Sequence, residues 1–183
     1  MRSAVVVVDM LNDFVDGPLA NPAARGIVEP IRSLTARARA TRDWVVVYAN
    51  DAHQPSDVEL RVFPPHAMAG TPGAEVIEAL RPEVADVIVP KRFYSSFTCS
   101  ALEDELRRHD VGRLVLVGQH TDCCVRHTAY DAFARGFEVA VCPDATAVFE
   151  PGAPEPIEAR QAKALEYLTT YYGARLVGSG DVA

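Results

Sequence analysis

Two adjacent cysteines follow a short apolar run in the second half of the chain. Leu114–Val117 is apolar throughout and is followed by a glycine, which predicts a strand buried on both faces. Apolar residues then recur at helical spacing over Val125–Arg135, so we expect Cys123 and Cys124 on the first turn of a helix. A helix N-terminus lowers the pKa of a thiol and can hold an oxyanion, so a nucleophilic cysteine could act there.

An acid and a cation stand at the ends of two other apolar runs. Asp9 follows Val5–Val8, and Lys91 follows Val87–Pro90. Because the carboxyl ends of parallel strands share one edge of a sheet, we expect a carboxylate, an ammonium and a thiol to meet there. The carboxylate can take the thiol proton and return it to a leaving amine, and the lysine stabilises the thiolate and the carboxylate. Taken singly, each has a plainer interpretation: a turn aspartate, a solvated lysine and a buried structural cysteine.

Strand-like and helical patterns alternate along the whole chain. They predict a single α/β domain over residues 1–183, doubly wound, with a mostly parallel six-stranded sheet and helices on both faces. The expected strands are Ala4–Val8, Trp44–Ala49, Val87–Val89, Leu114–Val117, Glu138–Cys142 and a last one near Arg175–Val177. The expected helices are Pro30–Thr41, Ala74–Leu80, Ser100–His109, Asp122–Arg135 and Pro156–Tyr172. The irregular stretch from Ala52 to Pro72 is long enough to suggest a functional loop.

Composition restricts the class of protein. The chain has 183 residues, 49% of them hydrophobic, with a mean hydropathy of +0.01, as expected for one globular domain with a full core. Its net charge is -7 without a basic run, so we expect neither nucleic acid nor membrane as a partner. The N-terminus lacks the cleavage region of a signal peptide, and we expect a cytoplasmic protein with reduced thiols at Cys99, Cys123, Cys124 and Cys142.

Three segments taken together are more specific than any single residue. They read Val-Val-Asp-Met-x-Asn-Asp-Phe from Val7, Lys-Arg-x-Tyr-Ser-x-Phe from Lys91, and Gly-x-x-Thr-x-x-Cys-Val-Arg-x-Thr-Ala-x-Asp-Ala from Gly118. This combination resembles the cysteine hydrolases of the isochorismatase-like superfamily, which include nicotinamidases, N-carbamoylsarcosine amidohydrolase, and ureidoacrylate and biuret amidohydrolases. The similarity extends from about Val5 to Phe149, most of the chain.

The resemblance implies a catalytic set of Asp9, Lys91 and Cys124. Cys124 is favoured over Cys123 because the family's cysteine directly precedes Val-Arg. The resemblance also implies a cis peptide at Gln119-His120 and an oxyanion hole made by the backbone amides of His120 and Cys124.

The resemblance also implies a metal site. Asp51 and His53 follow an expected strand, and His66 lies further along the irregular stretch. One carboxylate and two imidazoles suit a divalent metal such as zinc, although spacing alone favours a turn aspartate and two solvated histidines. Nicotinamidases hold a metal with an Asp-x-His pair and the histidine of Trp-Pro-x-His-Cys-x-x-Gly-Thr-x-Gly-Ala-Glu, so the resemblance implies zinc here and no organic cofactor. The chain departs from that segment where Phe63 replaces the tryptophan and Ala67 replaces the cysteine.

The implied activity is hydrolysis of a small-molecule amide through a cysteine thioester, with nicotinamide as the first candidate substrate. Phe14, Phe63 and Tyr94 are expected to stack on the substrate, with core packing as the alternative. The departures keep open a ureido or carbamoyl substrate of the ureidoacrylate, biuret or N-carbamoylsarcosine type, and isochorismatase activity is a further alternative. A binding module that has lost catalysis is the non-enzyme alternative, against which the intact catalytic set argues. Because the family is commonly dimeric or tetrameric, we expect a homodimer or homotetramer.

Overall fold

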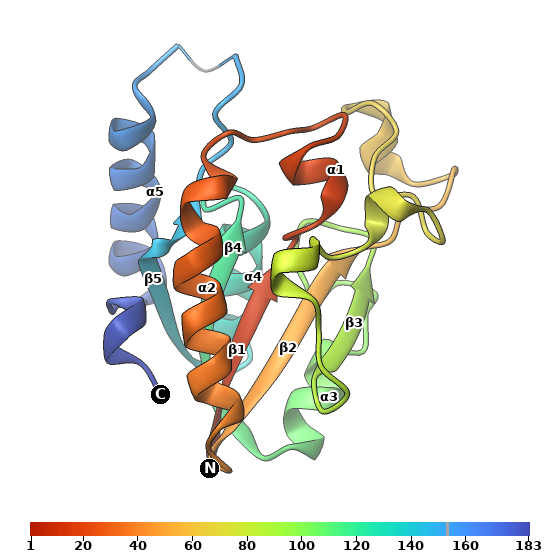
Figure 1. Ribbon diagram of the computed structural model, residues 1–183. Helices are drawn as coiled ribbons and strands as arrows, with labels where there is room; N and C mark the ends of the chain where they lie inside the picture. Colours follow the sequence, from red (N-terminus) through yellow and green to blue (C-terminus); the bar gives the residue numbers. More distant parts are fainter. Residues whose placement is uncertain (153) are drawn as a thin grey trace.

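Six strands form one sheet in the order β3-β2-β1-β4-β5-β6 in the computed structural model of the chain, which describes residues 1–152 and 154–183 (Figure 1). The strands are β1 (Arg2–Val8), β2 (Trp44–Asp51), β3 (Val87–Lys91), β4 (Val111–Gln119), β5 (Glu138–Ala147) and β6 (Arg175–Leu176). Every neighbouring pair in the sheet is parallel. The predicted α/β fold is confirmed, and β5 continues past its expected end at Cys142 to Ala147.

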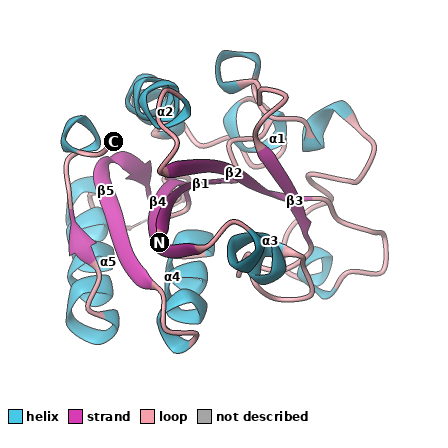
Figure 2. Cartoon of the chain, turned by 90° about the horizontal axis from the view of Figure 1, so that it is seen from below, coloured by secondary structure: helices cyan, strands magenta, loops and turns pink. Residues whose placement is uncertain are grey.

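Helices cover both faces of this sheet. The α-helices are α1 (Asn12–Val15), α2 (Ala24–Arg39), α3 (Leu102–Arg108), α4 (Cys124–Ala134) and α5 (Ile157–Tyr172), and the short 3₁₀ helices are η1 (Val58–Arg61), η2 (Pro72–Ala74), η3 (Glu78–Leu80) and η4 (Ser179–Asp181). Figure 2 shows α2 over one face of the sheet and α3, α4 and α5 over the other. No helix among the described residues is both long and apolar enough to cross a membrane.

The valines of β1 divide the interior into two cores. Val5 belongs to the core that contains Ile31 of α2, whereas Val6 belongs to the core that contains Val125 of α4. Successive side chains of a strand point to opposite faces, so a strand buried on both faces is apolar at every position. This double burial fixes β1 at the centre of the sheet and thereby fixes the position of the residue that follows it.

The helix predicted from Pro30 starts earlier than expected. α2 begins at Ala24, and Pro30 lies inside it. A proline in a helix interior costs about 3 kcal/mol, yet the first turns also carry Ile27, which is buried with the rest of the apolar face. Burial of one large aliphatic side chain contributes roughly 1.5–3 kcal/mol, so the extended apolar face offsets the proline.

The helix predicted over Ala74–Leu80 is wrong. η2 and η3 occupy its two ends, and the residues between them are extended. The amide of Ile77 donates to the carbonyl of Met10 at 3.0 Å, and the amide of Asn12 donates to the carbonyl of Glu75 at 3.0 Å. These backbone groups pair with the segment after β1 instead of with each other, so tertiary pairing overrides the local helical pattern.

The carboxyl edge of the sheet closes tightly around the end of β1. Gly118 of β4 lies opposite Val8 and has a φ of 102°. A Cβ at this position would lie 2.1 Å from the carbonyl oxygen of Val8, so only glycine fits. Asp9 follows directly with a φ of 51°, a left-handed conformation that costs a non-glycine residue roughly 1 kcal/mol or more. Such strain persists where the surrounding structure holds a functional side chain in place.

Candidate active site

Asp9, Lys91 and Cys124 meet at the carboxyl edge of the sheet. Asp9 follows β1, Lys91 ends β3 and Cys124 opens α4. Lys91 Nζ lies 2.7 Å from Asp9 Oδ2 and 2.6 Å from Asp51 Oδ1. Cys124 Sγ lies within 4.8 Å of a carboxylate oxygen of each aspartate, and all these side chains are buried. The structure therefore brings together the three residues expected from the sequence, and their catalytic roles stay a prediction.

In this cluster Asp9 is the group placed to accept the proton of the Cys124 thiol. Burial and the nearby Asp51 carboxylate raise the pKa of Asp9 to about 7, against the opposing effect of Lys91. Burial disfavours the Lys91 ammonium, but Asp51 and Asp9 outweigh it and raise the pKa of Lys91 well above its usual value. A hydrogen bond with Cys123, together with burial, raises the pKa of Cys124. The Cys124 thiol would therefore need a base to act as a nucleophile, and Asp9 is the adjacent group that ionises near neutral pH.

The peptide between Gln119 and His120 is cis, as the resemblance implied. The carbonyl of His120 then accepts from the amides of Cys123 at 3.0 Å and Val125 at 3.1 Å. Cys124 is the first residue of α4, and the first amides of a helix have no intrahelical acceptor. This arrangement leaves the backbone of His120 and Cys124 beside the thiol, where an oxyanion hole is predicted.

A buried amide pair that sequence reasoning missed holds this segment in place. Gln119 Nε2 donates to the carbonyls of Asp9 at 3.2 Å and Phe14 at 3.4 Å. Asn21 Nδ2 donates to Gln119 Oε1 at 3.1 Å and to the carbonyl of Val148 at 3.0 Å. Asn21 and Gln119 thereby tie together segments that are far apart in the chain. No spacing in the sequence indicates such a long-range contact.

The three expected metal ligands lie together with a fourth residue that sequence reasoning missed. Asp51, His53, His66 and Glu59 each offer a ligand atom within 4.8 Å of the others. His53 Nε2 lies 3.6 Å from Asp51 Oδ2, and His66 Nε2 lies 3.7 Å from Glu59 Oε1. Among the described residues, Asp51 Oδ2 and both Nε2 atoms are buried without a hydrogen-bond partner. Two imidazoles and two carboxylates with orphaned atoms fit a zinc ion. Glu59 lies in the irregular stretch outside any motif, so nothing in the sequence marked it.

Outer partners orient both histidines towards the cluster. His53 Nδ1 lies 3.1 Å from Asp57 Oδ2, and His66 Nδ1 lies 2.7 Å from the carbonyl oxygen of Pro64. Such partners fix the tautomer and ring orientation of metal-binding histidines. Burial disfavours the charged imidazolium, but Asp51, Asp57 and Glu59 outweigh it and raise the pKa of His53 to about 9. A metal must therefore displace a proton from His53 when it binds.

We expect Glu59→Gln to weaken zinc binding by at least about tenfold, because a neutral amide replaces one of the two carboxylates of the cluster. The purified wild-type protein should hold about one zinc ion per chain after incubation with zinc. Glu75→Gln is the matched control, since Glu75 is exposed and lies outside the cluster. Elemental analysis after dialysis against graded zinc gives both affinities. Equal zinc retention by the two variants would remove Glu59 from the ligand set.

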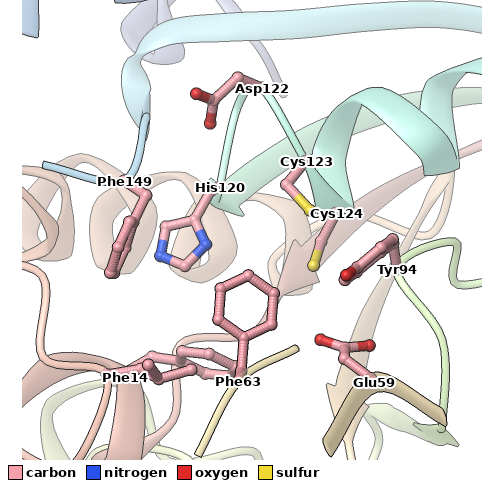
Figure 3. A pocket seen from close by; sticks show the side chains of 10 residues that line it. Phe14, Glu59, Phe63, Tyr94, His120, Asp122, Cys123, Cys124 and Phe149 are labelled. Atoms are coloured by element: carbon pink, nitrogen blue, oxygen red, sulfur yellow. The ribbon is translucent and has the colours of Figure 1, made fainter. Parts of the chain in front are cut away.

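A small cavity of about 150 Å³ opens onto the thiol (Figure 3). Phe14, Phe63 and Tyr94 line it, as expected for residues that contact substrate. Phe14 also packs edge-on against His66 and His120, with ring centroids 5.3 Å and 5.6 Å apart, so it contributes to packing as well. The remaining lining residues were not expected as substrate contacts, and they are Leu19, Glu59, Asp122, Cys123, Phe149 and the side chains of His120 and Cys124.

Comparison with known proteins identifies the family of this chain. The family model described as Isochorismatase domain matches residues 3–177. N-carbamoylsarcosine amidase from Thermoplasma acidophilum is 38% identical with a TM-score of 0.88, over 100% of this chain and 99% of that chain. Nicotinamidase/pyrazinamidase PncA from Bacillus subtilis is 34% identical with a TM-score of 0.84, over 97% of this chain and 100% of that chain. A pyrazinamidase from Pyrococcus horikoshii, solved in complex with zinc, is 28% identical with a TM-score of 0.85, over 97% and 99% of the two chains.

Proposed function

This chain belongs to the isochorismatase family, and from that premise we propose that it is a cysteine amidohydrolase that converts nicotinamide to nicotinate and ammonia. One observation carries the proposal: a buried carboxylate, ammonium and thiol, from Asp9, Lys91 and Cys124, meet beside a small aromatic cavity. A thiol beside a base can hydrolyse an amide through a thioester, and an adjacent ammonium stabilises the charges that form.

The geometry supports a two-stage mechanism. Asp9 takes the proton of Cys124, and the thiolate attacks the amide carbonyl while the backbone amides of His120 and Cys124 donate to the oxyanion. Asp9 then returns the proton to the departing nitrogen, which leaves as ammonia, and a thioester remains on Cys124. Water hydrolyses the thioester with Asp9 as the base, and the thiol is restored. Lys91 stays an ammonium throughout and stabilises the negative charges around it.

The donor set supports a metal as part of the substrate site. Asp51, His53, Glu59 and His66 would hold a zinc ion, which would supply a Lewis-acidic anchor for a ring nitrogen or a water. The similarity to a pyrazinamidase solved with zinc supports the same assignment.

The lining of the cavity favours a flat aromatic amide. Phe14, Phe63, Tyr94 and Phe149 contribute four aromatic side chains to a cavity that is mostly apolar. Aromatic rings stack on or pack edge-on against planar heterocycles. The similarity to nicotinamidase/pyrazinamidase PncA supports nicotinamide as the substrate.

A ureido or carbamoyl compound is the second candidate substrate. Similarity to N-carbamoylsarcosine amidase, at 38% identity over the whole chain, favours it. An ammonia-release assay with zinc-loaded enzyme separates the two, using nicotinamide, pyrazinamide, ureidoacrylate, biuret and N-carbamoylsarcosine. We expect the two aromatic amides to be hydrolysed fastest. Rapid turnover of a ureido or carbamoyl compound with none of nicotinamide would reverse the assignment.

Phe63→Ala should raise the KM for nicotinamide and change kcat little, because stacking is made equally in the ground and transition states. Aromatic contacts contribute about 0.5–1.5 kcal/mol beyond burial, so KM should rise roughly two- to tenfold. Phe133→Ala is the control, since Phe133 is exposed and lies outside the cavity. Steady-state kinetics of both variants give the comparison, and a KM unchanged in Phe63→Ala would remove Phe63 from the substrate site.

A further inference from the structure

The charged side chains that line the cavity are both acidic. Glu59 and Asp122 face it, and none of the described lining residues is a lysine or an arginine. Lys91 lies close to the thiol, but it is fully buried and its ammonium is bonded to Asp9 and Asp51. A substrate that extends away from Cys124 therefore meets negative charge and no free cation in the described part of the wall.

The guanidinium of Arg160 pairs with Asp122 and is not among the residues that line the cavity. Arg160 Nη2 lies 2.8 Å from Asp122 Oδ2, and Arg160 Nη1 donates to the carbonyl of Phe149. The other oxygen of Asp122, Oδ1, is buried and has no hydrogen-bond partner among the described residues. Asp122 therefore holds Arg160, which is not among the residues that line the cavity, and keeps one carboxylate oxygen without a hydrogen bond in the described structure.

His120 adds an uncharged polar group to the same side of the cavity (Figure 3). Its side chain is 8% exposed and packs edge-on between Phe14 and Phe149, with ring centroids at 5.6 Å and 5.0 Å. Its Nε2 is buried with no partner in the described structure. Burial lowers the pKa of His120 to about 3, so the imidazole is neutral at physiological pH and has no charge to offer a carboxylate.

A zinc ion in the adjacent cluster would offset the charge of Glu59 and leave Asp122 as the acidic side chain of this wall. Asp51 and Glu59 together carry two negative charges, which match the two positive charges of a zinc ion. The ion pair of Asp122 with Arg160 lies on the other side of the cavity and is not part of that cluster.

We propose that the wall formed by His120 and Asp122 selects uncharged amides and excludes amides that carry a carboxylate, with Asp122 as the specificity-determining residue. This inference rests on the proposed hydrolase function and narrows its substrate class. A substrate carboxylate beside Asp122 is repelled in a partly dehydrated site, and a like-charge contact of this kind strongly disfavours binding. Nicotinamide and biuret satisfy the requirement, whereas ureidoacrylate and N-carbamoylsarcosine do not.

The test compares acids with their own methyl esters, which differ mainly in charge. The two pairs are 5-carboxynicotinamide with its methyl ester and ureidoacrylate with its methyl ester, and ammonia release gives kcat/KM for each. In the wild type we expect kcat/KM for the ester to exceed kcat/KM for the acid by at least about tenfold, in whichever pair is hydrolysed. Asp122→Asn removes the carboxylate and releases Arg160, so it should lower that ratio by a similar factor.

Glu155→Gln is the matched control, because Glu155 pairs with Lys163 near Arg160 but does not line the cavity. Its ester-to-acid ratio should equal that of the wild type. A wild-type enzyme that hydrolyses acid and ester equally would overturn the proposal, as would equal changes of the ratio in Asp122→Asn and Glu155→Gln.

A second measurement does not depend on amide hydrolysis. If none of these compounds releases ammonia, the proposed function fails, and the charge preference is read from alkylation of Cys124 by neutral iodoacetamide and anionic iodoacetate. Tandem mass spectrometry separates Cys124 from Cys123. Asp122→Asn should raise the rate of Cys124 alkylation by iodoacetate relative to the rate with iodoacetamide. An unchanged ratio of these two alkylation rates would contradict selection by charge.

Discussion

Cys124→Ala should lower kcat for amide hydrolysis by roughly 10⁴-fold or more, because removal of a nucleophile leaves only the catalysis that binding and the oxyanion hole supply. Cys124 opens α4 and lies beside the carboxylate of Asp9. The matched control is Cys123→Ala, which removes the neighbouring thiol of the same cavity and should retain substantial activity. Ammonia release by the two variants under saturating substrate gives the comparison.

This pair of variants is decisive because Cys123 has its own claim to reactivity. A hydrogen bond with Cys124, reinforced by His127, lowers the pKa of Cys123 to about 6. A low pKa makes a thiol reactive towards alkylating agents, but catalysis also needs a base and an oxyanion hole around the attacking sulfur. If Cys123→Ala were inactive while Cys124→Ala kept its activity, Cys123 would be the nucleophile.

Asp9→Asn should lower kcat by roughly 10²-fold or more, since the amide keeps the shape of the side chain but cannot accept the thiol proton. In the wild type, kcat/KM should rise with pH through about 7, because Asp9 acts as a base only when ionised. Below that pH the carboxyl is protonated and activity falls. In Asp9→Asn, kcat should be low and kcat/KM should no longer rise with pH through this range.

Asp16→Asn is the control for the pH profile, because Asp16 is exposed and pairs with Arg25 at the surface. Its profile should match that of the wild type. A near-normal kcat in Asp9→Asn, or an acidic limb that persists in that variant, would remove Asp9 from proton transfer.

The predicted catalytic residues could be placed from the sequence because Asp9 and Lys91 stand at the ends of apolar runs and Cys124 opens the helix that follows a third. Asp9 follows β1, Lys91 ends β3, and Cys124 lies just beyond β4. A parallel sheet brings the carboxyl ends of its strands to one edge. Glu59 could not be placed in this way, because it lies in a short 3₁₀ helix whose position is set by tertiary contacts. The buried pair of Asn21 and Gln119 was missed for the same reason.

The local residue pattern also predicted the wrong structure where long-range backbone hydrogen bonds determine the conformation. The segment over Ala74–Leu80 has helical spacing, but its central residues pair with the chain after β1. The motif around Cys124 gave His120 a backbone role only. In the structure, the side chains of His120 and Asp122 both line the cavity. Their position depends on how α1 and the segment after β5 pack against them, which the motif does not show.

The most direct test of thioester chemistry at Cys124 is a rapid acid quench of zinc-loaded wild-type enzyme during turnover of nicotinamide, followed by tandem mass spectrometry of the peptide that contains Cys123 and Cys124. A nicotinoyl group on Cys124 Sγ is expected, and hydroxylamine should remove it, as it does for thioesters. Cys123 should stay unmodified. Ammonia release at the normal rate with Cys124 unmodified at every quench time would contradict a covalent mechanism at this residue.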